Sequence, residues 1–532
     1  MKKIFAYALA MAIAAPLSAQ NTFTNELMTN TSDIIGTSRY VSMGGAMGAL
    51  GAEISALNNN PASIALFRKS DVSMTMGAQI QGATPANGDP RARYTFDQAG
   101  FVAAFKNEIG FVNVALNLQK KANYGNSFFT GSNSLNGFSQ AAHLAALYGE
   151  FNPPTASLPT QAYNAYLYDI ENVAFRSSGF NFNRNTKGNL YGLDLNISGN
   201  LHDRIFLGAT FGIDFLKYKT SQRYVEYRDD SYGRIQDYDI VSNQNVSGTG
   251  FNFKLGAIVR PIEDNPLRFG FAIETPTFYR LSQKDSFYSI GSKWMSYHDK
   301  DTGQNRYEYI TTPGEYWLYD STDDNYLEFN VYSPWKFRAA IGSTYETFIA
   351  WDVEYEYSLN NRTRMGYPDG RNEYGQSTSM DTDKAINDVT QAMLRGVHNV
   401  RVGLEVKPID NLALRAGYNF YSSPMKSGAF FDQSVYSYAM EFTLGTDYIN
   451  LSAANIFTFG VGYRGKRFYA DLAYKYRSQT GDFYPFEDSY QANGASEAQF
   501  QRPDGGVVTG TLQPTKLNLD RHNITFTVGY RF

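Results

Sequence analysis

The chain has no cysteine, and only 5 histidines and 4 tryptophans among its 532 residues. Without cysteine, neither a disulfide framework nor a thiolate metal site can form. The histidines lack the spacing of metal ligands, and no Gly-x-Ser-x-Gly nucleophile motif is present. The histidines are His143, His202, His298, His398 and His522. The sequence therefore predicts no metal site, no cofactor and no enzymatic activity.

Long apolar runs are also missing. After Gln20 there is no stretch of about 18 apolar residues, the length that a spanning helix needs. Acidic residues (51) outnumber basic ones (47), so the electrostatic drive for nucleic-acid binding is absent. Tyr (40), Phe (38) and Gly (46) are abundant, whereas the mean hydropathy is negative at -0.39. This composition suits a β-barrel, in which only alternate residues face lipid.

The first nineteen residues have the pattern of a secretory signal peptide. Two lysines precede an apolar run from Ile4 to Pro16, and small residues ending at Ala19 form a cleavage site. A membrane anchor would need a longer apolar run. We expect residues 1–19 to be removed on export.

Alternation of apolar and polar residues is the strongest signal in the rest of the chain. Phe457, Phe459 and Val461, for example, alternate with small or polar residues, as on a strand with one apolar face. The pattern predicts about fourteen strands, an even number as in single-chain bacterial barrels. They are expected near residues 71–81, 98–105, 110–120, 188–199, 205–219, 250–260, 267–274, 335–342, 348–357, 397–406, 412–420, 456–464, 467–477 and 523–532.

The connections between these strands alternate between short and long. Asn107–Ile109 is short, whereas Lys121–Lys187, Thr220–Thr249 and Pro276–Pro334 are long. A soluble β-sandwich would show the same alternation within strands, but turns on one side and loops on the other are typical of outer-membrane barrels. We therefore predict an all-β fold, a transmembrane antiparallel β-barrel over residues 71–532 in a Gram-negative outer membrane.

The last strand runs to a terminal phenylalanine. Ile524, Phe526, Val528, Tyr530 and Phe532 face one way, and this resembles the signal that barrel-assembly machinery recognises. Outer-membrane lipid and that machinery are the expected partners, and a monomer is expected.

Residues 20–70 do not have the pattern of a barrel strand. The segment is too long for a linker and too apolar to hang in the periplasm, so we expect it to fold into the lumen as a hatch. It carries a glycine-rich stretch from Gly44 to Gly51, followed by Asn60-Pro61-Ala62. Asn-Pro starts a turn and alanine permits close packing, so Asn60 could either gate transport or only form a turn.

The glycine-rich stretch with Asn60-Pro61-Ala62, placed between a signal peptide and a first barrel strand, resembles the hatch of FadL-type outer-membrane channels. Those channels carry long-chain fatty acids and aromatic hydrocarbons. The resemblance covers the hatch and, by strand count, the barrel. It implies a hatch that gates passive uptake of hydrophobic small molecules, and loop helices that capture the ligand.

The loop between Lys121 and Lys187 offers candidate capture residues. Apolar residues recur there at helical spacing, which predicts two amphipathic helical turns. The candidates are Leu144, Tyr148, Tyr163, Tyr166 and Leu167. The alternative is that these residues only pack the loop against the barrel rim.

Charged residues are predicted on the lumen face. They could hold a carboxylate head group or do acid–base chemistry, or they could pair with one another and with the hatch. They are Lys254, Arg260, Arg268, Arg401, Arg415, Arg464, Lys475, Arg477, Glu274, Asp352, Glu354, Glu356, Glu405 and Asp471. The alternatives to hydrophobic uptake are a haem or other nutrient receptor or porin, and a structural surface barrel without transport.

Overall fold

The computed structural model describes most of the chain from residue 33 onward. The described ranges are 33–81, 92–108, 110–132, 176–229, 235–263, 265–292, 327–368, 380–382, 384–427, 446–486, 498–501, 507–510 and 512–532, with single residues and short pieces within 134–162, within 295–319 and at 429. The predicted signal peptide, residues 1–19, lies outside them.

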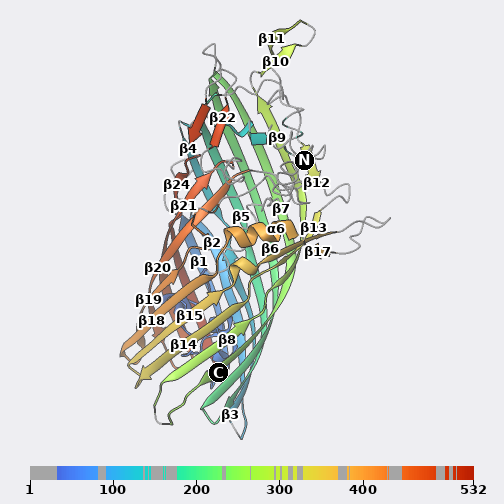
Figure 1. The fold of residues 1–532 in the computed structure, drawn as a ribbon. Helices are drawn as coiled ribbons and strands as arrows, with labels where there is room; N and C mark the ends of the chain where they lie inside the picture. Colours follow the sequence, from blue (N-terminus) through green and yellow to red (C-terminus); the bar gives the residue numbers. More distant parts are fainter. Residues whose placement is uncertain are drawn as a thin grey trace, which may run out of the picture.

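The chain forms a closed antiparallel barrel of fourteen strands, as predicted (Figure 1). Four of these strands continue across a break and carry two labels. In chain order they are β1 (Asp71–Gln81), β2 (Ala92–Lys106), β3 (Gly110–Asn123) with β4 (Asn126–Ser132), β5 (Arg176–Leu201), β6 (Ile205–Asp229), β7 (Ile235–Val259), β8 (Arg268–Glu274) with β9 (Phe278–Ser292), β13 (Leu327–Tyr332) with β14 (Lys336–Tyr345), β15 (Ile349–Ser358) with β16 (Arg364–Pro368), β18 (Val397–Ile409), β19 (Leu412–Tyr421), β20 (Tyr448–Arg464), β21 (Phe468–Tyr484) and β25 (Arg521–Arg531). The first and last strands close the barrel from Asp71↔Arg531 to Gln81↔Arg521.

Shorter elements complete the described part. They are α3 (Ser38–Ser42), η1 (Ile54–Asn58), η2 (Pro61–Leu66), β10 (Met295–Asp299), β11 (Gln304–Glu308), β12 (Tyr316–Tyr319), η4 (Asn360–Arg362), β17 (Met380–Thr382), α6 (Lys384–Met393), β22 (Ala498–Gln501), β23 (Val507–Gly510) and β24 (Thr515–Asn518). No helix in the described ranges is long and apolar enough to cross a membrane.

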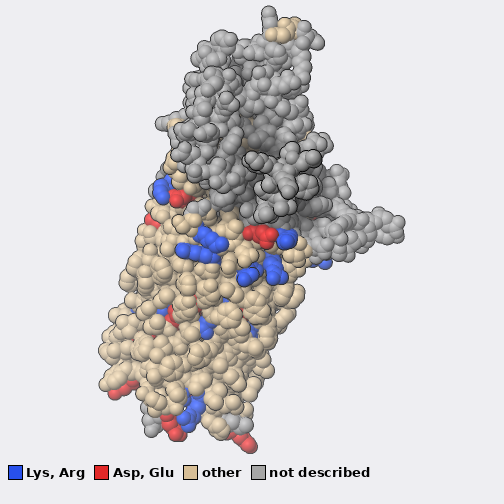
Figure 2. Space-filling view, viewed as in Figure 1, with Lys and Arg blue, Asp and Glu red and all other residues tan. Residues whose placement is uncertain are grey.

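The strand faces divide as the alternation predicts. Phe457 and Phe459 are 43% and 57% exposed on the outer surface, whereas Asp471 and Lys475 on the neighbouring strand are buried inside. Figure 2 shows the result as a broad, mostly uncharged belt, with Lys, Arg, Asp and Glu gathered at its two edges. Such a belt is the lipid-facing surface of a membrane barrel.

Several strands are much longer than predicted. β5, β6 and β7 have 26, 25 and 25 residues, so parts of the predicted loops 121–187, 220–249 and 276–334 are strand. At about 3.3 Å per residue such strands greatly exceed an apolar band of roughly 25 Å. Their upper parts stand above the lipid and need no apolar outer face, so the alternation that marks a membrane strand is absent there.

Three neighbouring strands are interrupted at their middle. Pro276 separates β8 from β9, Pro334 separates β13 from β14, and η4 separates β15 from β16. Proline cannot donate to a strand ladder. Next to this region, α6 lies where the barrel wall would otherwise continue upward from β18 (Figure 1).

Candidate functional site

The segment from residue 33 to residue 70 lies inside the barrel. Its short helix α3 contacts β19, β20, β21 and β25, whereas η2 contacts β3, β5, β6 and β7 on another part of the wall. Met43, Met47, Leu57 and Ile64 are completely buried between these contacts. The described part of the predicted hatch therefore reaches across the lumen and packs against several strands.

The Asn60-Pro61-Ala62 motif forms the N-terminus of η2. The Asn60 side-chain oxygen accepts a hydrogen bond from the Ala62 N–H (3.0 Å), and Pro61 occupies the first position of the helix, as expected for an N-cap followed by proline. The Asn60 amide also donates to the carbonyl of Gly48 in the hatch (2.9 Å) and of Ala257 in the wall (3.1 Å). Asn60 thus joins the turn, the hatch and the wall.

Glycines on the inner barrel wall receive this motif. A Cβ at Gly208 on β6 would lie 2.5 Å from the Pro61 carbonyl oxygen and 2.6 Å from the Ala62 nitrogen. At Gly256 on β7, which pairs with Gly208, a Cβ would lie 2.8 Å from Pro61 Cδ and would collide with the Asn60 oxygen. The hatch therefore approaches the wall so closely that only backbone fits between them.

Similar glycine contacts occur elsewhere around the lumen. A Cβ at Gly403 would lie 2.5 Å from the Met43 carbonyl oxygen, and one at Gly460 would collide with Ser42. These positions are on β18 and β20, away from the Asn-Pro-Ala motif. The hatch is thus seated against glycine on more than one part of the wall.

Buried polar groups hold the hatch to the wall. One Asp352 oxygen on β15 accepts hydrogen bonds from the backbone N–H groups of Ala49 (2.9 Å) and Leu50 (2.8 Å). Arg39 of α3 donates to both carboxylate oxygens of Glu405 on β18, at 3.1 and 3.3 Å. Because these groups are shielded from water, breaking one contact leaves an unsatisfied buried polar group, which is costly.

The first described hatch residue is also tied to the wall. Lys475 on β21 donates to the Asp33 carboxylate (2.6 Å) and to the Ile34 carbonyl (2.8 Å). Burial acts to raise the pKa of Asp33, but the charges of Lys475 and Arg477 outweigh it and lower this pKa to about 2. Burial raises the pKa of Glu53, another hatch carboxyl, against the opposing effect of Arg39.

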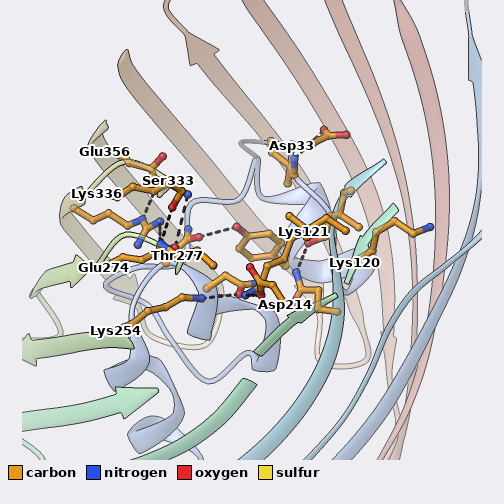
Figure 3. Close-up of a pocket in the computed structure, with 18 of the residues that line it drawn as sticks. Asp33, Lys120, Lys121, Asp214, Lys254, Glu274, Thr277, Ser333, Lys336 and Glu356 are labelled. Carbon is orange, nitrogen blue, oxygen red and sulfur yellow. Dashed lines mark hydrogen bonds and ion pairs between the residues drawn. The ribbon is translucent and has the colours of Figure 1, made fainter. Parts of the chain in front are cut away.

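Above the hatch lies a small, highly charged chamber (Figure 3). Its volume is about 80 Å³, room for several water molecules. Lys121 contacts Asp214 at 2.6 Å, and Tyr279 donates to the other oxygen of the same carboxylate at 2.9 Å. On the opposite side, Arg338 bridges Glu274 (2.7 Å) and Glu356 (2.5 Å).

The lumen charges therefore pair with one another and with the hatch, one of the possibilities that the sequence left open. Arg401 pairs with Glu354 and with Glu356, and Arg415 pairs with Glu405 and with Asp471. Arg338, Arg401 and Arg415 thus each bond two carboxylates. Other predicted arginines differ: Arg268 donates to the Leu50 carbonyl of the hatch, Arg477 to the Gln479 side chain and Arg260 to the backbone carbonyls of its own turn.

A large apolar cluster fills the upper part of the barrel. It consists of buried inward residues from several strands, among them Phe180, Phe182, Leu281, Phe329 and Phe483. The ring centroids of Phe182 and Phe483 are 4.7 Å apart, and those of Phe180 and Phe483 are 6.2 Å apart. The barrel interior thus changes from apolar and aromatic above to polar and charged near the hatch.

The described pieces of the loop after β4 belong to this cluster. Leu144 is fully buried in it, as are Leu135, Leu158 and Ala162. Of the five predicted capture residues, Leu144 therefore lines the upper lumen. The other four, Tyr148, Tyr163, Tyr166 and Leu167, lie outside the described residues.

A buried carboxylate anchors the loop. Glu226 on β6 accepts hydrogen bonds from the Ser139 hydroxyl (2.5 Å) and the Gln140 backbone N–H (2.9 Å). Tyr224 and Tyr238 donate to the same carboxylate at 2.7 and 2.9 Å. Glu226 lies in the stretch expected to be loop, and nothing in the local sequence distinguishes it from an exposed loop carboxylate.

No group of histidine or acidic residues in the described part of the chain could hold a metal ion. The paired carboxylates Asp352, Glu354 and Glu356, considered for acid–base chemistry, bond the hatch or arginines instead. These three carboxylates are therefore hydrogen-bond acceptors for the hatch and for neighbouring arginines.

No protein-family model and no curated protein matches this chain. Among solved structures it is similar to a Pseudomonas aeruginosa FadL homologue, with 12% identity, 97% of this chain and 100% of that chain covered, and a TM-score of 0.49. It is similar to the Pseudomonas putida toluene transporter TodX (11% identity, 94% and 99% covered, TM-score 0.48) and to the Ralstonia pickettii toluene transporter TbuX (12%, 94% and 99%, 0.48).

Proposed function

We propose that this protein is an outer-membrane channel for the passive uptake of hydrophobic small molecules, such as long-chain fatty acids or aromatic hydrocarbons. The observation that carries the proposal is the interior of the upper barrel. Its inward residues include a large cluster of packed phenylalanine, tyrosine and leucine side chains, and ligand sites for apolar molecules are lined mainly in this way, with a few polar groups such as Arg184 and Asp447 among them.

The hatch supports the same conclusion. A polar porin needs an open aqueous lumen, whereas this lumen is occupied by buried hatch residues such as Met43, Met47 and Ile64. A hydrophobic molecule would enter among the upper apolar residues and stop above the charged chamber, because exposing apolar surface to water costs about 25 cal/mol per Å².

Two arrangements allow such a molecule to leave: movement of the hatch, or passage through the wall. Thr277 and Ser333 line the chamber beside the prolines that interrupt the neighbouring strands. The wall is therefore least regular where the apolar part of the lumen ends.

Uptake by intact cells tests the proposal. Cells that produce the protein should accumulate a labelled long-chain fatty acid or toluene several times faster than cells without it, and lipid mass spectrometry of the purified protein should detect apolar ligand. Equal uptake by the two strains would contradict the transport function. A large, steady aqueous current in planar bilayers would instead identify a polar porin.

A further inference from the structure

Helix α6 (Lys384–Met393) closes part of the outer barrel wall. Ser358 on β15 pairs with Val397 on β18, and farther up Gly366 pairs with Thr382 on β17. Between these pairs, the side-chain amide of Asn387 accepts from the Met365 N–H (2.8 Å) and donates to the Met365 carbonyl (3.2 Å). The Asn387 side chain thus makes the two hydrogen bonds to the Met365 backbone that a neighbouring strand would otherwise make. These bonds hold α6 against the wall.

The described residues of α6 and its C-terminal end separate into a buried and an exposed side. Thr390, Met393 and Leu394 are buried, at 0%, 2% and 0% exposure. Lys384, Asp388, Gln391 and Arg395 are exposed and recur every three or four residues, so they share one side of the helix. This polar side faces away from the barrel.

Five exposed cations surround that side, and we call them the basic patch: Arg362, Arg364, Lys384, Arg395 and Lys426. Within the described chain none of the five forms an ion pair, and Asp388 is the described acidic residue on the exposed side of α6. Figure 2 shows Lys and Arg side chains gathered at the height of α6, directly above the uncharged belt.

Backbone bonds bring members of the patch together. The Arg395 N–H donates to the Pro424 carbonyl (2.9 Å), and the Lys426 N–H donates to the Met393 carbonyl (2.8 Å). Each of these two side chains donates one hydrogen bond to a backbone carbonyl: Arg395 to that of Ser423 and Lys426 to that of Gln391. A guanidinium has five donors and an ammonium three, so most of their donors remain available.

The patch stands directly above lipid-facing aromatic residues. Tyr355 and Tyr357 lie beside His398, whose ring is 5.0 Å from that of Tyr357 and whose Nδ1 is 2.7 Å from the Tyr355 hydroxyl. Farther down β18, the strand of His398, Val402 and Leu404 are exposed on the apolar belt. Aromatic residues mark the membrane interface, so the patch lies at head-group height on the long-loop side.

We propose that the basic patch binds the phosphate groups of a phosphorylated glycolipid in the outer leaflet of the membrane. Arginine and lysine bind phosphate through charge-assisted hydrogen bonds, and clustered cations at an interface attract anionic lipid. The acyl chains would lie on the belt below, and the sugar on the aromatic rings. The proposal rests on the outer-membrane location in the proposed function, and not on transport.

The first test is the lipid that remains with the protein. Arg362→Gln, Arg395→Gln and Lys426→Gln are combined in one variant, and phosphorylated glycolipid per protein is measured by mass spectrometry after purification in mild detergent. At least a fivefold loss is expected. A matched variant, Lys69→Gln, Lys106→Gln and Lys466→Gln, removes three exposed cations at the short-turn side and should keep the lipid.

Two further measurements show whether the phosphate and the positive charges are what matter. A charge-preserving variant, Arg362→Lys, Arg395→Lys and Lys426→Arg, should retain most of the lipid, and wild-type protein should bind vesicles of the enzymatically dephosphorylated glycolipid at least fivefold more weakly. These measurements remain informative if the glutamine variant does not fold, which the gel mobility of unheated protein reveals. Unchanged lipid in the folded glutamine variant, or equal binding of the two vesicle types, would overturn the proposal. Lost uptake with lipid binding retained would count against the transport function alone.

Discussion

Gly208 and Gly256 form a glycine socket on the inner wall, where the Asn-Pro-Ala motif contacts it. Adding a side chain at one of these glycines should displace the hatch. A Cβ at Gly256 collides with the Asn60 oxygen and lies 3.0 Å from the Pro61 nitrogen, atoms that are held by the backbone turn of η2. Gly256→Ala should therefore disturb the bonds of Asn60 to Gly48, Ala257 and Ala62. Three hydrogen bonds at about 0.5–1.5 kcal/mol each, with an overpacking cost of about 1–3 kcal/mol, give roughly 2.5–7.5 kcal/mol against hatch docking. Even the lower figure raises the undocked population by roughly 70-fold.

Single-channel recording measures this directly. Gly256→Ala should show frequent open events, and cells carrying it should become sensitive to a bulky polar antibiotic. Gly199→Ala is the matched control, because Gly199 lies on β5, which β6 separates from β7, and a Cβ there meets no atom within 4 Å. If the two variants have equal conductance while both fold as barrels, the hatch does not depend on the socket and the reasoning is wrong.

Three other changes test the remaining contacts. Glu226→Gln should loosen the inserted loop by about 1–3 kcal/mol, seen as faster amide exchange at Gln140; unchanged exchange would contradict an anchoring role. Because the folded pKa of Asp33 is about 2, below the ordinary value of 3.8, its tether to Lys475 should be complete above about pH 4 and lost as pH falls through 2. Fluorescence of a probe on the hatch would follow this loss, and Asp33→Asn should remove the dependence. Arg39→Met should weaken hatch docking by about 3–5 kcal/mol, since a buried pair loses one partner; channel opening no more frequent than in the wild type would argue against this.

The barrel was predictable because the membrane imposes a repeating rule on each spanning strand. Lipid requires an apolar residue at every second position, so Phe457 and Phe459 mark their strand without reference to any distant residue. Above the belt that rule ends. The residues of β7 from Ile235 to about Gly248 alternate only weakly, so the sequence predicts a loop there although they pair with β6 throughout.

The hatch motif was visible in the sequence, but its partners were not. Gly208 and Gly256 look like ordinary strand glycines, and they follow Pro61 by well over a hundred residues. Only closure of the barrel places them at the motif. In the same way, lumen charges such as Arg401 and Glu354 were recognised as inward, but whether they pair or receive a ligand depends on side-chain distances that alternation does not encode.

The contacts around the hatch favour exit through the wall over departure of the hatch. Moving the hatch breaks several buried ion pairs and hydrogen bonds together, whereas the wall beside Pro334 already lacks part of its ladder. A hatch that is locked in place tests this hypothesis. The Ser38 and Thr527 hydroxyl oxygens are 3.0 Å apart, and because the chain has no other cysteine, the double variant Ser38→Cys, Thr527→Cys would form a single defined cross-link. Uptake that persists in the oxidised variant would support a route through the wall. Uptake that stops on oxidation and returns on reduction would show that the hatch itself must move.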